Sequence, residues 1–195
     1  MPEFDRFSHD YQAKLEQSIR GLGTVDSALR SKLHILQKLT GSHSNEAVNR
    51  ILDFGCGTGL LTDLLQNIAQ TVFGVDVSLD SLRNSASRVS KLAVFDGFQL
   101  PFLDNSFDVV VASCVFHHIS PDSRPEIVGE IRRILTLGGI LIVIEHNPFN
   151  PVTRFVVNRC EFDKDAELLS LSETRTLLRS GQFKKFHSGY FCKIG

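Results

Sequence analysis

Three closely spaced glycines follow a short apolar run in the segment ILDFGCGTGLLT, residues 51–62. Gly55, Gly57 and Gly59 form the pattern GxGxG, and Asp53 lies two residues before the first of them. Glycine at a turn from an apolar strand into a helix lets the backbone lie against a ligand, because no Cβ collides with it. The segment therefore indicates a small-molecule site, with a tight turn that holds no ligand as the alternative.

Neither of two common glycine loops fits this segment. A phosphate-binding P-loop requires GxxxxGK followed by Ser or Thr, but Leu60 follows Gly59 and no lysine is near. A dinucleotide-binding loop has the pattern GxGxxG, and an acid at the position of Asp53 is foreign to it. Asp76 ends the next apolar run, where a carboxylate can hold a ribose diol. The loop therefore suits a nucleoside better than a pyrophosphate.

Apolar strands and helical segments alternate along the chain from residue 50 onward. Strands are expected over residues 50–55, 71–78, 91–97, 106–116 and 140–146, and helices over residues 60–69, 79–90 and 124–139. Gly138 and Gly139 are expected to end the last of these helices. Right-handed crossovers then give a doubly wound, Rossmann-like α/β fold, a mostly parallel sheet with helices on both faces. Ligands bind such sheets at the carboxyl ends of the strands.

The segments before and after this core are expected to be mainly helical or irregular. Residues 11–23 and 27–41 have helical patterns, and residues 170–183 predict a helix with a capping box from Ser170 to Glu173. Residues 184–191 are a candidate sixth strand. We expect one domain over residues 1–195, divided into a helical lid (1–48), a cofactor-binding core (49–147) and substrate-side and carboxyl-terminal elements (148–195).

Composition and charge limit the partners of this chain. Its formal net charge is −1, with 42% hydrophobic and 22% charged residues, which predicts no general attraction to nucleic acid or to a membrane surface. The polar, acidic amino terminus is unlike a secretory signal, so we expect a cytoplasmic protein. The cysteines form no CxxC pair, and we expect them to be buried as small apolar residues: Cys56, Cys114, Cys160 and Cys192.

Several motifs, in order, resemble those of class I S-adenosylmethionine-dependent methyltransferases. They are LDFGCGTG, VFGVDVS, VFDGFQLPFLDNSFDVVVASCVFHHI and EIRRILTLGGILIVIEH, which together cover roughly residues 50–147. The flanking segments are similar to a bacterial subgroup of small-molecule methyltransferases. The resemblance implies S-adenosyl-L-methionine as cofactor and a small molecule as methyl acceptor. It also implies a set of cofactor-binding residues: Asp53, Gly55, Cys56, Gly57, Gly59, Asp76, Val77, Asp96, Gly97 and Ser113.

For three acids in this set, the resemblance implies a cofactor-binding role, and a purely structural role is the alternative. Asp53 would attract the α-ammonium group of the cofactor, or else cap the following helix. Asp76 would accept hydrogen bonds from the ribose diol, or else cap the helix at residue 79. Asp96 would accept from the adenine amino group, or else close the turn in which it lies.

Catalytic and acceptor-side residues are expected around the ends of the fourth and fifth strands. Glu145 and His146 follow the fifth strand, and His146 is a candidate general base because its ordinary pKa is near neutral. A histidine that only fixes the following turn is the alternative. His117 and His118 are expected to line the mouth of the site. We expect no metal, because adjacent histidines do not converge on one ion and no third ligand is suitably spaced. In the lid, Tyr11 and Lys32 are similar to positions that touch cofactor or acceptor.

The chain departs from the resemblance at its carboxyl end. Class I sheets have seven strands, whereas five parallel strands and one candidate sixth are found here, so we expect strand seven to be missing. The fifth strand would then have an unpaired edge, which predicts lower thermal stability or a homodimer in place of a monomer. A catalytically impaired cofactor-binding or partner-binding module is the alternative to an active enzyme. A dinucleotide-dependent oxidoreductase is disfavoured by the GxGxG pattern.

Overall fold

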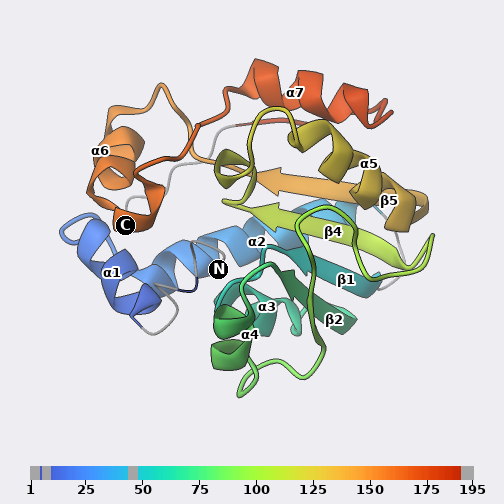
Figure 1. The fold of residues 1–195 in the computed structure, drawn as a ribbon, viewed down its shortest axis with the longest axis horizontal. Coiled ribbons are helices and arrows are strands. Elements are labelled where there is room, and N and C mark those ends of the chain that lie inside the picture. Colours follow the sequence, from blue (N-terminus) through green and yellow to red (C-terminus); the bar gives the residue numbers. More distant parts are fainter. Residues whose placement is uncertain (1–4, 6–9, 44–47, 190–195) are drawn as a thin grey trace.

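Five parallel strands form the centre of the structure, a computed structural model that describes residue 5 and residues 10–43 and 48–189 (Figure 1). The strands are β1 (Val48–Phe54), β2 (Ala69–Asp76), β3 (Leu92–Val94), β4 (Phe107–Ser113) and β5 (Leu135–Ile144). Their order in the sheet is β3-β2-β1-β4-β5, and every neighbouring pair is parallel. The order reverses between β1 and β4, where crossovers diverge and a ligand crevice is expected. The predicted doubly wound, Rossmann-like α/β fold is confirmed.

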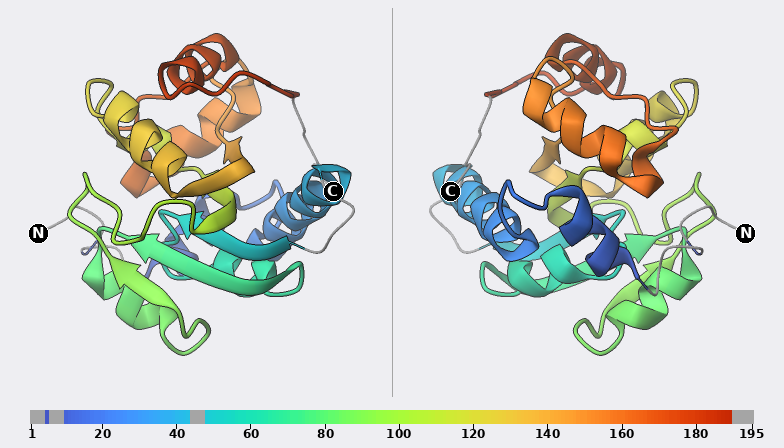
Figure 2. Two further views of the ribbon diagram at one scale, coloured as in Figure 1. Left: turned by 90° about the vertical axis from the view of Figure 1, so that its right-hand side faces the viewer. Right: turned by 90° about the vertical axis from the view of Figure 1, so that its left-hand side faces the viewer.

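Helices cover both faces of this sheet. They are α1 (Tyr11–Ser18), α2 (Val25–His43), α3 (Leu60–Leu65), α4 (Leu79–Ser85), α5 (Arg124–Ile134), α6 (Pro151–Arg159) and α7 (Leu171–Ser180), with short 3-10 helices η2 (Phe116–His118) and η3 (Glu161–Asp163). Figure 2 shows α5 and α7 on one side of the strands and α2 on the other.

Alternate residues of the central strands face two separate apolar layers. Leu52 of β1 packs with α5 on one face, and its neighbour Ile51 packs with α2 and α3 on the other. Both side chains are fully buried. Strands that are buried on both faces read as continuous apolar runs, which is why β1 and β4 were recognisable in the sequence.

The end of α5 and the start of β5 differ from the prediction. The helix expected over residues 124–139 ends at Ile134, and β5 begins at Leu135. Leu135 is fully buried and pairs with Phe107, so the chain extends before it reaches the glycines. Gly138 takes a φ of +84° within β5, where the register with β4 shifts. The glycines therefore belong to a strand irregularity and do not end the helix.

Two predicted helices of the core are also shorter than expected. The helix over 60–69 ends at Leu65, because Ala69 already belongs to β2 and pairs with Val48. The helix over 79–90 ends at Ser85, and residue Ala86 is its C-cap.

The capping box predicted for the last helix is confirmed. The hydroxyl of Ser170 accepts from the backbone N–H of Glu173, whose carboxylate accepts from the backbone N–H of Ser170. Residues 184–189 of the candidate sixth strand are irregular, and residues 190–191 lie outside the described part of the chain. Among the described residues β5 is therefore an edge of the sheet. In the same part of the chain, no helix combines the length and the apolarity that a membrane span requires.

Candidate functional site

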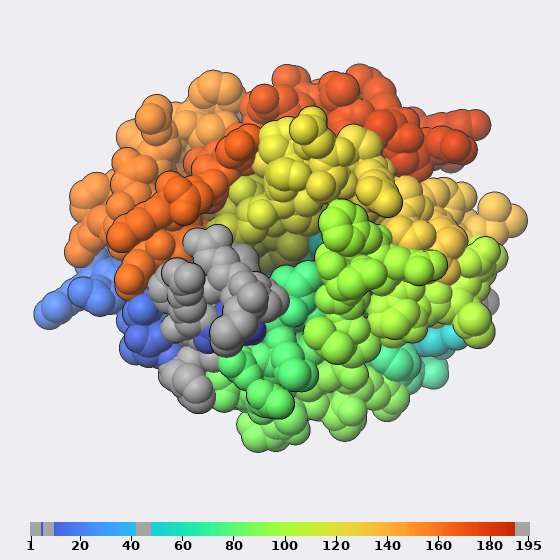
Figure 3. All heavy atoms as spheres, in the orientation of Figure 1, coloured from blue at the N-terminus to red at the C-terminus, as the bar shows by residue number. Residues whose placement is uncertain are grey.

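A cavity of about 430 Å³ lies at the carboxyl ends of β1, β2 and β4, where the strand order reverses. Ligand cavities in proteins span roughly 300–1,000 Å³. Residues of α1 and α2 line one side of the cavity, and residues of η2, α6 and η3 line another. Figure 3 shows the molecule hollowed between the α4 side (green) and the segment that leads into α5 (yellow).

Most of the predicted site residues line this cavity. They are Tyr11, Lys32, Asp53, Gly55, Cys56, Gly57, Asp76, Val77, Gly97, Ser113, His117, His118 and His146. Among the described residues, the predicted members Gly59, Asp96 and Glu145 are not part of the cavity wall. Distant segments of the sequence, from the lid to residue 163, thus meet at one place.

The turn between β1 and α3 has backbone conformations that glycine adopts readily. Gly55 and Gly57 have φ values of +71° and +53°, in the left-handed region. A Cβ on Gly55 would lie 2.6 Å from Cγ2 of Val115, which is closer than van der Waals contact allows. A Cβ on Gly57 would meet no heavy atom of the described residues within 4 Å, because this glycine borders the cavity. Packing against Val115 therefore requires glycine at position 55, whereas Gly57 exposes its backbone to the cavity.

Asp76 links the end of β2 to the glycine turn. One of its carboxylate oxygens accepts from the backbone N–H of Gly57 at 2.8 Å, and the other accepts from the backbone N–H of Ser78 at 2.8 Å. The cap of α4 is Ser78, whose hydroxyl accepts from the N–H of Ser81, so capping by Asp76 is not observed in the described structure. Burial raises the pKa of Asp76. The carboxylate thus stands at the cavity wall next to the glycine turn.

Asp53 is nearly inaccessible, with 2% of its surface exposed. Its carboxylate accepts from the hydroxyl of Thr62 at 2.6 Å. Burial raises its pKa to about 7. The N-cap of α3 is Gly59, with a φ of +75° and no side-chain cap from the described residues, so Asp53 does not cap that helix.

The structure places Asp96 away from the cavity wall. One oxygen of its carboxylate accepts from the backbone N–H groups of Phe98 and Gln99, at 2.9 and 2.8 Å. These hydrogen bonds lower the pKa of Asp96. Its side chain closes the turn after β3, the alternative that the sequence left open, while the next residue, Gly97, borders the cavity.

Lys32 from α2 reaches across the cavity to the end of β4. Its ammonium donates to the hydroxyl of Ser113 at 2.8 Å and lies 3.4 Å from the sulfur of Cys114. Burial alone would raise the pKa of the Cys114 thiol, but Lys32 and His146 lower it to about 6. The pKa of His146 is raised, chiefly by the neighbouring Cys114. Cys114 therefore differs from the inert apolar residue that was expected, whereas Cys56 and Cys160 are buried as predicted.

Glu145 holds the turn that carries His117. One carboxylate oxygen accepts from the backbone N–H groups of Val115 and Phe116, at 3.1 and 2.8 Å. The other oxygen lies 2.5 Å from Nδ1 of His117. Burial would raise the pKa of Glu145, but the His117 contact keeps it below its ordinary value. Both oxygens are engaged by residues 115–117 and the side chain lies outside the cavity wall, so this geometry gives Glu145 a positioning role and disfavours it as a general base.

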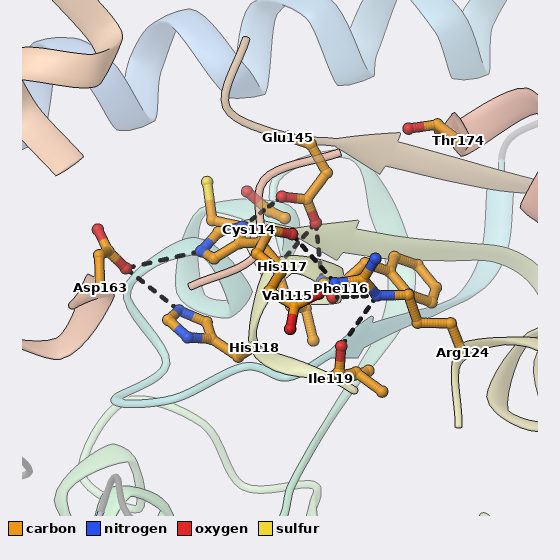
Figure 4. A network of polar contacts seen from close by, with 12 residues as sticks. Cys114, Val115, Phe116, His117, His118, Ile119, Arg124, Glu145, Asp163 and Thr174 are labelled. Carbon is orange, nitrogen blue, oxygen red and sulfur yellow. Dashed lines mark hydrogen bonds and ion pairs between the residues drawn. The ribbon is translucent and has the colours of Figure 1, made fainter. Parts of the chain in front are cut away.

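His117, His118 and Asp163 converge at one end of the cavity (Figure 4). Nε2 of His118 lies 3.2 Å from an oxygen of Asp163, and Nε2 of His117 lies 3.6 Å from the same oxygen. The expectation that adjacent histidines cannot converge, with no third ligand near, is therefore wrong. The η2 turn aims both rings at Asp163. Burial alone would lower the pKa of His117, but the carboxylates of Asp163 and Glu145 raise it to about 10.

Arg124 ties the segment after η3 to the η2 turn. Its guanidinium donates to the carbonyl oxygens of Phe116, Ile119 and Glu167 at 3.0, 2.9 and 3.0 Å. The backbone N–H of Glu167 also donates to the carbonyl of His117 at 2.8 Å. These contacts bring Asp163 to the histidines, although nothing in its local sequence marks it as a site residue.

Helix α1 lines the same end of the cavity. The ring of Tyr11 stacks on Phe162 with centroids 4.8 Å apart. Lys14 lies 3.0 Å from the carboxylate of Glu161 in η3. Burial and nearby negative groups, beginning with Cys114, raise the pKa of Tyr11. Helix α1 and η3 thus pack together at the cavity, and no pattern in the sequence indicated the Phe162 contact.

Comparison with known proteins finds similarity to methyltransferases in the central part of the chain. Residues 52–143 match a family described as a methyltransferase domain. A protein from Staphylococcus carnosus that is named an uncharacterised methyltransferase is 34% identical over 104 residues, 52% of this chain and 49% of the relative. One of the same description from Geobacillus thermodenitrificans is 25% identical over 142 residues, covering 71% and 63% of the two chains. The chain spans about half to two thirds of the length of these relatives.

Solved structures share the fold. The YcgJ protein of Bacillus subtilis is similar with a TM-score of 0.62 at 26% identity, over 78% of this chain and 68% of that one. A structure from Thermotoga maritima, described as an S-adenosylmethionine-dependent methyltransferase and possible histamine N-methyltransferase, gives a TM-score of 0.73. That likeness covers 93% of this chain and 80% of the other at 23% identity, and it therefore concerns the fold alone.

Proposed function

We propose that the chain is a class I S-adenosylmethionine-dependent methyltransferase, with S-adenosylmethionine as cofactor, and that it methylates a small molecule bound in the cavity described above. The observation that carries the proposal is the cavity itself. It joins a glycine turn and two buried carboxylates on one side to a cluster of ionisable side chains on the other.

The cofactor is proposed to lie along the ends of β1 and β2. Gly55 and Gly57 expose backbone to its methionyl part, and Asp53 faces its ammonium group. Asp76 would bind the ribose diol with the lone pairs that its two backbone hydrogen bonds leave free. Gly97 borders the space for the adenine, whereas Asp96 is engaged in its own turn.

The acceptor is proposed to lie between the lid and the ends of β4 and β5. Bound S-adenosylmethionine supplies an electrophilic methyl group on a sulfonium, so the chain must align the acceptor with it and exclude water. Tyr11, Lys32 and the two histidines of η2 border that side of the cavity. His146 is the candidate base there, because it lines the cavity and neighbours the Cys114 thiol.

Transfer of a labelled methyl group from S-adenosylmethionine to a panel of phenols, amines and thiols tests this function. With an acceptor found, His146→Gln is expected to lower kcat by about 10²–10⁴-fold, the usual contribution of a general base, without changing cofactor affinity. His34→Gln is a matched control, because His34 is exposed on α2. Cofactor binding with no turnover on any acceptor would instead support the impaired-module alternative, and unchanged kcat in His146→Gln would remove the base.

A further inference from the structure

We propose that His117, His118 and Asp163 bind one divalent transition-metal ion of the Zn²⁺ class at the acceptor end of the cavity. One ligand atom from each residue lies within 4.8 Å of those of the other two. Imidazole nitrogens with one carboxylate are a donor set that Zn²⁺ and its neighbours in the first transition row prefer.

Two of the three distances between the donor atoms are close to those of a tetrahedral metal site, and the two histidine nitrogens, which lie within 4.8 Å of each other, would have to come within about 4 Å on binding. Two ligands in a tetrahedral site, each about 2.0–2.1 Å from the metal, lie about 3.4 Å apart. The oxygen of Asp163 is 3.2 Å from Nε2 of His118 and 3.6 Å from Nε2 of His117. A hydrogen bond between the oxygen and Nε2 of His117 would require about 2.7–3.2 Å.

His117 provides a second, independent indication of a ligand. Its Nε2 atom is buried without a hydrogen-bond partner among the described residues, and the whole residue is 2% exposed. A buried polar atom without a partner is costly, and native structures rarely leave one without a reason. A metal ion bound to this nitrogen would satisfy it.

Glu145 gives His117 the support that metal-binding histidines commonly have. Its carboxylate lies 2.5 Å from Nδ1 of the ring and accepts the proton there, so a metal ion would take the place of the proton on Nε2, the atom that faces Asp163. The same carboxylate is fixed by the N–H groups of Val115 and Phe116. The orientation of the ring is therefore set before any ligand arrives.

The remaining coordination positions of the metal face the cavity. All three ligand residues line the same cavity as the glycine turn. A metal with three protein ligands keeps a position for water or for an oxygen, nitrogen or sulfur atom of another molecule. On the basis of the proposed function, that position would hold and activate the acceptor.

Zinc titration of the full chain, after removal of metals with a chelator, tests the site without S-adenosylmethionine or turnover. We expect one Zn²⁺ per chain, and visible d–d absorption of a four-coordinate site when Co²⁺ replaces it. His118→Ala and Asp163→Asn should abolish both signals. Glu145→Gln should weaken Zn²⁺ binding by about 10–100-fold, the usual effect of losing such a support.

Two control variants make the result specific. Asp165→Asn changes an exposed acid two residues from Asp163, and His34→Gln removes an exposed histidine of α2; both should bind Zn²⁺ like the parent chain. Circular dichroism establishes that each variant folds, and His118→Gln replaces any variant that does not. Absence of binding in the parent chain, equal binding by His118→Ala, or loss of binding in His34→Gln would overturn the proposal. A failed methyl-transfer assay would leave these readouts unaffected.

Discussion

A methyl group added at Gly55 is expected to lower the stability of the fold, whereas one added at Gly57 is expected mainly to weaken cofactor binding. In Gly55→Ala the new Cβ lies 2.6 Å from Cγ2 and 2.8 Å from Cγ1 of Val115, at a φ of +71°. The left-handed backbone costs about 1–2 kcal/mol and overpacking about 1–3 kcal/mol. The free energy of unfolding should therefore fall by about 2–5 kcal/mol. For a chain of this size, the Tm should fall by roughly 10 °C.

In Gly57→Ala the left-handed backbone costs a similar free energy, but there is no additional cost from overpacking. The new Cβ meets no heavy atom within 4 Å in the described part of the chain and points into open space at the cavity. The free energy of unfolding should fall by about 1–2 kcal/mol. Cofactor affinity should fall more than tenfold, because a steric cost above about 1.4 kcal/mol has that effect.

Differential scanning calorimetry and titration with S-adenosylhomocysteine measure the two effects separately. Val115→Ala combined with Gly55→Ala should recover the overpacking part of the loss, with Val115→Ala alone as control, because both clashing atoms belong to that side chain. Gly57→Ala with unchanged affinity for S-adenosylhomocysteine would refute the reasoning. The glycine pattern would then serve only a tight turn.

Three further predictions concern the walls of the cavity and the last helix. The rate of alkylation of Cys114 by iodoacetamide should rise with pH with a midpoint near pH 6, because the lowered pKa of the thiol leaves it as thiolate above that pH. Lys32→Met should raise this midpoint by about 2 pH units, and a midpoint near pH 9 in the parent chain would contradict the prediction. Arg124→Met should lower the free energy of unfolding, measured by urea denaturation, by about 2–4 kcal/mol, because three carbonyl groups lose a hydrogen-bond donor. A loss below about 1 kcal/mol would count against this prediction. Ser170→Ala should cost about 1 kcal/mol by the same measurement, and an unchanged midpoint would show that the capping box does not stabilise α7.

Local patterns predicted the sheet and the glycine turn well. Strands β1 and β4 are apolar on both faces, and the glycine turn directly follows β1, so each could be recognised from neighbouring residues. The start of β5 could not, because Gly138 and Gly139 also fit a helix end. The start of β5 is set by the pairing of Leu135 with Phe107, a contact between segments that are distant in the sequence.

The acceptor side of the cavity was predicted less completely for the same reason. Asp163 lies near the two histidines because Arg124 holds a segment more than 40 residues later in the sequence. The hydrogen bond from Arg124 to the carbonyl of Glu167, four residues after Asp163, makes this contact. Cys114 follows β4 and owes its lowered pKa to Lys32 of α2 and to His146. Side chains that tertiary packing brings together leave no mark in the spacing of the sequence.

Calorimetric titration of the full chain with S-adenosylmethionine and with NAD tests the central claim most directly. We expect one molecule of S-adenosylmethionine to bind per chain, NAD to give no heat of binding, and Asp76→Asn to weaken S-adenosylmethionine binding, because its carboxylate stands at the cavity wall beside the glycine turn. Binding of NAD without binding of S-adenosylmethionine would contradict the account.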